Sequence, residues 1–158
     1  DMTRKYFDDW IETEEFDTPT RTITETDVVM FAALSGDYNE LHTSAEATKE
    51  NQFGQRIAHG LLILGISHGL LFRTGFLDQT AIAFLSVHDW KFQAPVFFGD
   101  TIRVKFKVHE KKESKSKSDR GVVTLYLEVI NQNNAVVQSG YKAIMVKRLQ
   151  KRNSSEKI

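Results

Sequence analysis

The second half of the chain alternates apolar and polar residues with a period of two, the pattern of β-strands that bury one face. In the segment 102–109 every even position is apolar and every odd position is Arg, Lys or His. Residues 123, 125, 127 and 129 form another apolar face, and the segments 81–92 and 135–146 are also predicted to be strands. Turn residues follow at Gly99-Asp100 and at 131–134. The pattern predicts about four long antiparallel strands. It also favours a bulge at Gly140 and a polar loop over 111–120.

The first half of the chain is less periodic and carries helix signals. Thr26 or Asp27 is a suitable N-cap for a helix over 28–34, and Gly36 is expected to end that helix. Residues 1–19 are charged and aromatic, and we expect them to form a loosely ordered lead-in with one short strand.

The segment 58–72 is apolar nearly all round, so a helix there must be buried on most sides. It contains Gly60, Gly65 and Gly69, and each Gly inside a helix costs about 1 kcal/mol relative to Ala. Gly65 and Gly69 lie four residues apart, on one helical face, where they would let another backbone approach closely. These features predict a helix that lies tightly against a concave sheet.

The predicted elements form one α+β domain, in which an antiparallel sheet wraps around one buried helix. We place this domain at residues 1–148, because no repeat or linker divides the chain. Residues 149–158 are charged, and we expect them to form a disordered tail.

Composition removes several classes of function. The chain has 21 Lys and Arg against 21 Asp and Glu, so no net charge favours nucleic acid or an anionic membrane. It has no Cys, which excludes disulfides, thiolate catalysis and Cys-ligated metals. The longest apolar stretch, 61–72, is shorter than the roughly 20 residues that span a bilayer, and no apolar leader is visible at the start of the chain. We therefore expect a soluble, cytoplasmic protein.

Asp37 and His42 are the strongest candidates for chemistry. They lie five residues apart on a turn-rich loop, so a carboxylate and an imidazole can converge on one point. Such a pair can activate a water molecule and supply a proton. Asn39 lies between them and can either fix the loop or orient one of the two side chains.

Gly60 lies in the first turn of the apolar helix. Its N–H lacks a partner within the helix and forms part of the positive end of the helix dipole. Such an N–H suits an oxyanion, and a Gly allows close approach of a substrate. His59 directly precedes Gly60, and His68 lies eight residues after it. The five His residues form no metal motif, since neither a His-x-x-x-His helix nor a cluster of carboxylates accompanies them.

The segment Ser35-Gly36-Asp37-Tyr38-Asn39-Glu40-Leu41-His42 resembles the hydratase motif of the MaoC-like, (R)-specific enoyl-CoA hydratase family. The stretches 56–60 and 95–100 are also similar to that family, and the resemblance covers about residues 20–148. It implies the hotdog fold and reversible addition of water to a trans-2-enoyl thioester of coenzyme A. It also implies a homodimer or a higher homo-oligomer, in which the sheets of two copies join near the site.

Carried over by position, the resemblance implies that Asp37 and His42 are the catalytic pair and that the Gly60 N–H polarises the thioester carbonyl. Asn39, His59 and His68 are the expected substrate-binding residues. Coenzyme A enters only as part of the substrate, and neither a metal nor a separate cofactor is expected.

Two positions depart from the family pattern. Glu40 replaces the usual Pro, which would stiffen the loop. His68 stands where some members carry a Ser, which puts the supporting polar contact there in doubt.

Three other functions stay open at this stage. A hotdog thioesterase would need a carboxylate or nucleophile on the apolar helix, and the segment 58–72 contains no Asp or Glu. A non-catalytic acyl-CoA-binding or regulatory module would not need both Asp37 and His42. A DNA-binding regulator is the least favoured, because the charge is balanced and no basic recognition helix is visible.

Overall fold

The computed structural model describes residues 3–149 of the chain. In chain order the elements are η1 (Phe7–Asp9), β1 (Glu15–Asp17), β2 (Arg21–Thr22), α1 (Glu25–Ser35), α2 (Glu40–Thr43), α3 (Ala45–Thr48), α4 (Gly60–Phe72), β3 (Ala81–Phe92), β4 (Thr101–Glu113), β5 (Arg120–Ile130) and β6 (Val136–Lys147). The predicted tail lies outside the described residues except for Leu149.

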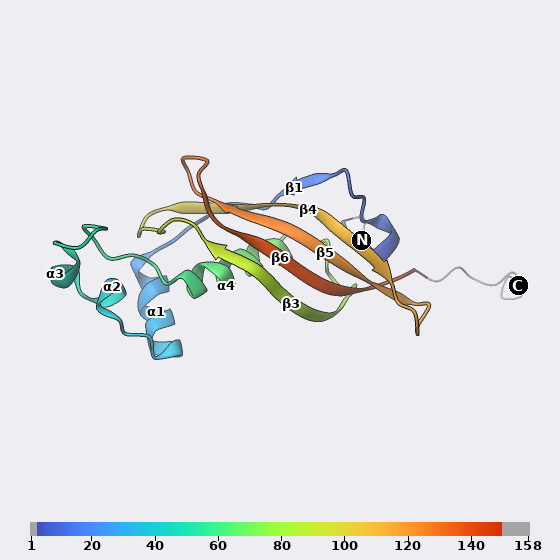
Figure 1. The fold of residues 1–158 in the computed structure, drawn as a ribbon, viewed down its shortest axis with the longest axis horizontal. Helices are drawn as coiled ribbons and strands as arrows, with labels where there is room; N and C mark the ends of the chain where they lie inside the picture. Colours follow the sequence, from blue (N-terminus) through green and yellow to red (C-terminus); the bar gives the residue numbers. More distant parts are fainter. Residues whose placement is uncertain (1–2, 150–158) are drawn as a thin grey trace, which may run out of the picture.

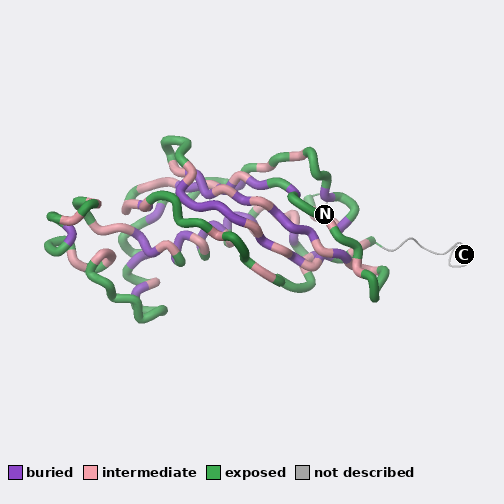
Figure 2. The backbone as a smooth tube through the Cα atoms, viewed as in Figure 1, coloured by how far each residue is buried: buried purple, intermediate pink, exposed green. Residues whose placement is uncertain are grey.

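The strands form one antiparallel sheet in the order β1-β4-β5-β6-β3, with β2 paired to β4. Helix α4 lies along one face of this sheet, and α1, α2 and α3 gather at one end (Figure 1). Buried positions follow the central strands and α4, whereas the end that carries α2 and α3 is largely exposed (Figure 2). A sheet that covers one apolar helix confirms the predicted α+β hotdog fold.

Strands β4 and β5 are the regular part of the sheet. The predicted inward residues of β4 are all buried, and these are Ile102, Val104, Phe106 and Val108. The inward residues of β5 are buried as well, and these are Val123, Leu125, Leu127 and Val129. One register shift interrupts this pair, between Val108 and Glu110. The period-two pattern therefore predicted both the strands and the faces that they bury.

Strands β3 and β6 pair less regularly, with three register shifts along β3. The backbone of Asp89, beside the last shift, has a φ of 49°. Gly140 pairs in register with Leu127 of β5, so the predicted bulge in β6 is wrong. A Cβ at Gly140 would lie 2.6 Å from the Trp90 ring. Gly140 is therefore where β6 makes room for the Trp90 indole, and the irregularity lies in β3.

The amino-terminal segment is part of the core, and the predicted loose lead-in is wrong. Trp10 is 1% exposed and packs with Phe16, Phe76 and Phe106. The Lys111 ammonium donates to the Trp10 carbonyl at 2.8 Å. Lys111 lies in β4, which extends to Glu113. The strand therefore includes the first residues of the segment 111–120, which we predicted to be a loop. Because the surrounding sequence is polar and charged, it did not indicate that Trp10 and Phe16 pack against the sheet.

Helix α1 begins earlier than predicted, because its N-cap is Thr24 rather than Thr26 or Asp27. The Thr24 hydroxyl accepts from the Asp27 N–H, and the Asp27 carboxylate accepts from the Thr24 N–H. This reciprocal capping box satisfies two N–H groups at the helix start. Gly36 ends the helix at a φ of 80°, as predicted.

Helix α4 begins at Gly60 and buries one side against the sheet, through Leu62, Ile63, Ile66, Ser67, Leu70 and Leu71. Gly65 and Gly69 are exposed on the opposite side, and a Cβ at either would meet nothing within 4 Å. The predicted close approach to the sheet at these two residues is therefore wrong. Among the described residues no helix is both long and apolar enough to cross a membrane.

Candidate active site

The loop after α1 is held by short-range hydrogen bonds that aim Asp37. Gly36 reverses the chain, and the Asp37 N–H donates to the Ser35 hydroxyl at 3.1 Å. One carboxylate oxygen of Asp37 accepts from the Asn39 N–H at 3.1 Å, an Asx turn that restrains the side chain. The other oxygen stays available, and half of the side chain is exposed.

His42 lies on α2 and faces Asp37. Its Nδ1 lies 2.7 Å from the Ile57 carbonyl oxygen, which can only accept, so Nδ1 carries the proton in the neutral ring. The Nε2 atom is then an unprotonated base, 4.0 Å from an oxygen of Asp37. This distance is too long for a direct hydrogen bond, but it leaves room for a third group that both atoms can bind.

His59 supports this pair from beneath. It is 2% exposed, its Nε2 donates to the Asp37 carbonyl at 3.0 Å, and its ring stacks on the His42 ring at a centroid distance of 3.8 Å. Its Nδ1 is buried and has no hydrogen-bond partner among the described residues. His59 therefore fixes the Asp37 backbone and the plane of the His42 ring. It also lines a cavity together with these two residues.

Gly60 is the first residue of α4, so its N–H has no partner within the helix. Its carbonyl accepts from the Gln138 side chain of β6 at 3.0 Å, and Gln138 accepts in turn from the Trp90 indole at 2.9 Å. A Cβ at Gly60 would lie 2.7 Å from the Phe92 ring, so a larger residue here would require that ring to move. The helix start is thus fixed by β3 and β6 together.

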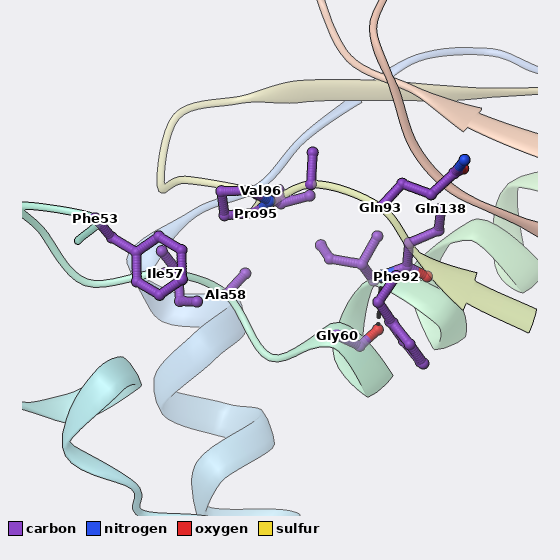
Figure 3. Close-up of a pocket in the computed structure, with 11 residues that line it drawn as sticks. Phe53, Ile57, Ala58, Gly60, Phe92, Gln93, Pro95, Val96 and Gln138 are labelled. Atoms are coloured by element: carbon purple, nitrogen blue, oxygen red, sulfur yellow. Dashed lines mark hydrogen bonds between the residues drawn. The ribbon is translucent and has the colours of Figure 1, made fainter.

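Two adjoining cavities meet at Gly60 and Phe92. The catalytic pocket has a volume of about 300 Å³ and is lined by Asp37, His42, His59, Gly60, Leu61 and Phe92. The apolar pocket has a volume of about 370 Å³ and lies between the segments 53–58 and 93–96 (Figure 3). Gln138 and Ile63 line it as well. A ligand at Gly60 is in contact with both cavities.

Asp37, His42 and His59 also form the one described cluster of side chains with metal-ligand spacing, since their ligand atoms lie within 4.8 Å of one another. The two rings, however, are stacked with only 26° between their planes. A metal binds the in-plane lone pair of an imidazole, and lone pairs in two stacked planes do not meet at one ion. This geometry does not fit a metal, and the prediction that none binds stays a prediction.

The structure thus brings together four of the six predicted site residues, namely Asp37, His42, His59 and Gly60. Asn39 lines neither cavity, and its side chain caps α2 by accepting from the Leu41 N–H at 2.9 Å. His68 lies further along α4, where Lys142 contacts it. Both remain predicted substrate contacts.

Sequence reasoning did not identify Phe92, Gln138 or Lys142. Phe92 looked like an ordinary strand residue. Gln138 and Lys142 carried a usable signal, because both share the inward face of β6 with the buried residues Ile144 and Val146. A polar side chain at such a position requires a partner or a function.

Residues 11–132 match the family model of the MaoC-like domain. The chain therefore belongs to the MaoC-like dehydratase family.

Among curated relatives, the protein MaoC of Klebsiella aerogenes is 38% identical over 65% of this chain and 30% of its own length. An (R)-specific enoyl-CoA hydratase of Rhodospirillum rubrum is 34% identical over 65% of this chain and 68% of that protein. A crystal structure described as a monoamine oxidase regulatory protein of Archaeoglobus is 34% identical, with a TM-score of 0.84 over 93% of this chain and 97% of that one. The chain spans about half or less of the first two curated relatives that it matches.

Proposed function

We propose that this protein adds water reversibly to a trans-2-enoyl-CoA and forms an (R)-3-hydroxyacyl-CoA. One observation carries the proposal. The free Nε2 of His42 and an oxygen of Asp37 face each other across 4.0 Å in a pocket that Gly60 also lines. The similarity to the (R)-specific enoyl-CoA hydratase of Rhodospirillum rubrum supports both the reaction and its stereochemistry.

The gap between Asp37 and His42 fits one water molecule. A water about 2.8 Å from each acceptor can donate one hydrogen to Asp37 and the other to His42. Because both groups only accept in the proposed state, they draw electron density onto the water oxygen. His42 acts as the general base, and its Nδ1–H bond to the Ile57 carbonyl steadies the imidazolium that forms.

The water oxygen attacks carbon 3 of the enoyl group, and the electrons of the carbon–carbon double bond move toward the thioester carbonyl. The Gly60 N–H stabilises the oxyanion of the resulting enolate, aided by the positive end of α4. The proton taken from water is then delivered to carbon 2 by the Asp37–His42 pair, which completes the addition. No cofactor is needed in this scheme, because the thioester itself acidifies carbon 2.

The substrate is held by the two cavities that meet at Gly60. The apolar pocket is lined by Phe53, Ile57, Pro95 and Phe92 among others, which suits the apolar part of an acyl thioester (Figure 3). Its opening toward the surface leaves room for the rest of coenzyme A. We therefore propose an acyl-CoA as the small-molecule partner.

We also propose that two copies pair through β3. This twelve-residue strand is an edge of the sheet, so one side of its backbone is unpaired in the described chain. It exposes five large apolar side chains, which are Ile82, Phe84, Leu85, Val87 and Phe92. Such an edge favours sheet-to-sheet pairing with a second copy. A dimer mass by light scattering, lost in Val87→Lys, is the expected result, and a monomeric wild type would contradict it.

The reaction is tested by following the enoyl-thioester absorbance of crotonyl-CoA and of a longer trans-2-enoyl-CoA. The wild type is expected to consume at least one of them, and Asp37→Asn to lose that activity while it keeps its fold. Asp78→Asn is the matched control, because Asp78 lies far along the chain in the turn before β3. Release of free coenzyme A would instead indicate a thioesterase. A folded wild type that changes neither substrate would contradict the proposal.

A further inference from the structure

A lysine is buried behind α4, outside the residues that the proposed reaction uses. Lys142 is 1% exposed, and it lies on the inward face of β6 together with Ile144 and Val146. Its ammonium lies 5.4 Å from the centre of the Trp90 ring. Removing an ammonium from water is costly unless a partner compensates for the loss.

Within residues 3–149, no carboxylate lies within ion-pair distance of Lys142. Its one polar contact is the Nδ1 atom of His68, at 3.1 Å. Burial lowers the pKa of Lys142 to about 8, and burial together with the Lys142 charge lowers the pKa of His68 to about 4. The site therefore contains a cation and a neutral imidazole, but no anion.

The contact also fixes the tautomer of His68. An ammonium can only donate, so Nδ1 accepts and the proton of the neutral ring is on Nε2. That N–H is a second donor, polarised by the neighbouring cation. The His68 ring lies between Phe72 and Phe84, at centroid distances of 4.9 and 4.8 Å, and the residue is half-buried. The pair thus offers donors in surroundings that are otherwise aromatic and apolar.

The pair lines neither of the two cavities, and it lies further along the two elements that carry Gln138 and Gly60. Gln138 lines the apolar pocket, and Lys142 is four residues further along the same face of β6. Trp90 connects the two, since its indole donates to Gln138 and its ring lies against Lys142. On α4, His68 is eight residues beyond Gly60, which corresponds to roughly 12 Å along the helix axis. This is the reach of a medium-length acyl chain whose thioester carbonyl lies at Gly60.

From this placement we infer that Lys142 and His68 select enoyl thioesters whose acyl chain ends in a carboxylate. The inference rests on the proposed hydration and names the class of acyl group that the reaction uses. A terminal carboxylate would supply the anion that Lys142 lacks and would accept from the His68 N–H. A methyl-ended chain of the same length would leave the cation buried and unpaired.

The first test compares trans-2-octenedioyl-CoA with trans-2-octenoyl-CoA as substrates of the wild type. The value of kcat/KM is expected to be about ten- to a hundredfold higher for the first, the usual effect of a hydrogen bond to a charged group. A six-carbon pair of the same two kinds measures the length dependence. Equal use of both end groups at both lengths, or a preference for the methyl end, would overturn the inference.

The second test removes the cation. Lys142→Met has a similar volume and no charge, and it is expected to abolish or reverse the preference, mainly through KM. Lys147→Met is the matched control, because Lys147 is an exposed residue of the same strand, and this variant is expected to keep the preference. His68→Gln gives an independent readout and is expected to weaken the preference. A preference that survives both Lys142→Met and His68→Gln would overturn the inference.

Binding separates this inference from the proposed reaction. Octanedioyl-CoA and octanoyl-CoA are saturated and cannot be hydrated, so calorimetry with them reports recognition alone. Tighter binding of octanedioyl-CoA, lost in Lys142→Met, with no turnover of any enoyl-CoA would contradict the hydration and support the selectivity. Turnover that depends on Asp37, with no difference between the two end groups, would support the hydration and overturn the selectivity.

Discussion

The two halves of the sheet contrast in regularity and in chemistry. Strands β4 and β5 pair over ten residues each with one register shift, and their inward faces carry only apolar side chains over most of their length. Strands β3 and β6 pair with three shifts, and their inward face carries Gln138 and Lys142. Both halves cover the same helix, and the second binds the start of that helix through the hydrogen bond from Gln138 to Gly60.

This difference teaches that fold and function draw on different parts of one sheet. The β4–β5 half provides apolar burial, which stabilises in proportion to area and tolerates no polar intrusion. The β3–β6 half gives up some of that burial, and its polar residue Gln138 binds the helix start and lines the apolar pocket. Phe92 of β3 lines the pocket that also contains Asp37 and His42. Variants in the β4–β5 half should therefore lower stability, and variants around the β3–β6 half should lower turnover.

The largest expected effect is on the catalytic pocket. His42→Ala removes the general base, and turnover of a trans-2-enoyl-CoA is expected to fall about 10²- to 10⁴-fold with little change in thermal stability. His109→Ala, an exposed residue of β4, is the control and should retain normal turnover. Near-normal turnover of His42→Ala in the absorbance assay would remove this residue from the mechanism.

The regular half should show the opposite response. Phe106→Ala removes a buried ring that packs against the buried Trp10, and we expect the free energy of unfolding to fall by about 3–5 kcal/mol. The variant that remains folded at low temperature should still turn over substrate. Denaturant unfolding and the absorbance assay together measure this. If Phe106→Ala kept normal stability and lost turnover, the contrast between the two halves would be contradicted.

The buried cation predicts a stability effect of opposite sign. Replacing an uncompensated charge by an apolar side chain of similar size, as in Lys142→Met, should raise the free energy of unfolding by about 1–4 kcal/mol at neutral pH. The folded pKa of Lys142 is about 8 and its ordinary value is 10.5, so between these values the unfolded chain binds more protons. The free energy of unfolding of the wild type should therefore rise with pH through this window, and its deficit relative to Lys142→Met should become smaller. A difference that stays constant across the window in unfolding titrations would show that Lys142 is not desolvated.

The smallest effect concerns the outer face of α4. Gly65 is exposed, and a Cβ there meets nothing, so Gly65→Ala should stabilise the protein by up to about 1 kcal/mol through helix propensity alone. A loss of stability would mean that this face packs closely against something, as the sequence had suggested. Thermal unfolding measured at several protein concentrations separates packing within one chain from packing against a second copy.

The same contrast explains what could be predicted from sequence. The alternation in 102–109 and 123–129 located β4, β5 and their buried faces, because burial there is purely apolar. The motif around Asp37 and His42 predicted the pair that the structure brings together. The sequence could not show that Gly65 faces outward, since an apolar helix has no polar face to orient it. Nor could it show that Trp10 is buried, because its neighbours are charged and its partners are distant in the chain.

The central claim is that Asp37, His42 and Gly60 add water to an enoyl thioester on one face. The most direct measurement identifies the product formed from a trans-2-enoyl-CoA by nuclear magnetic resonance and reads its configuration with stereospecific 3-hydroxyacyl-CoA dehydrogenases. The account predicts a single (R)-3-hydroxyacyl-CoA in equilibrium with the enoyl form, and none with Asp37→Asn. Free coenzyme A, an (S) product, or an unchanged substrate in the presence of folded wild-type protein would contradict it.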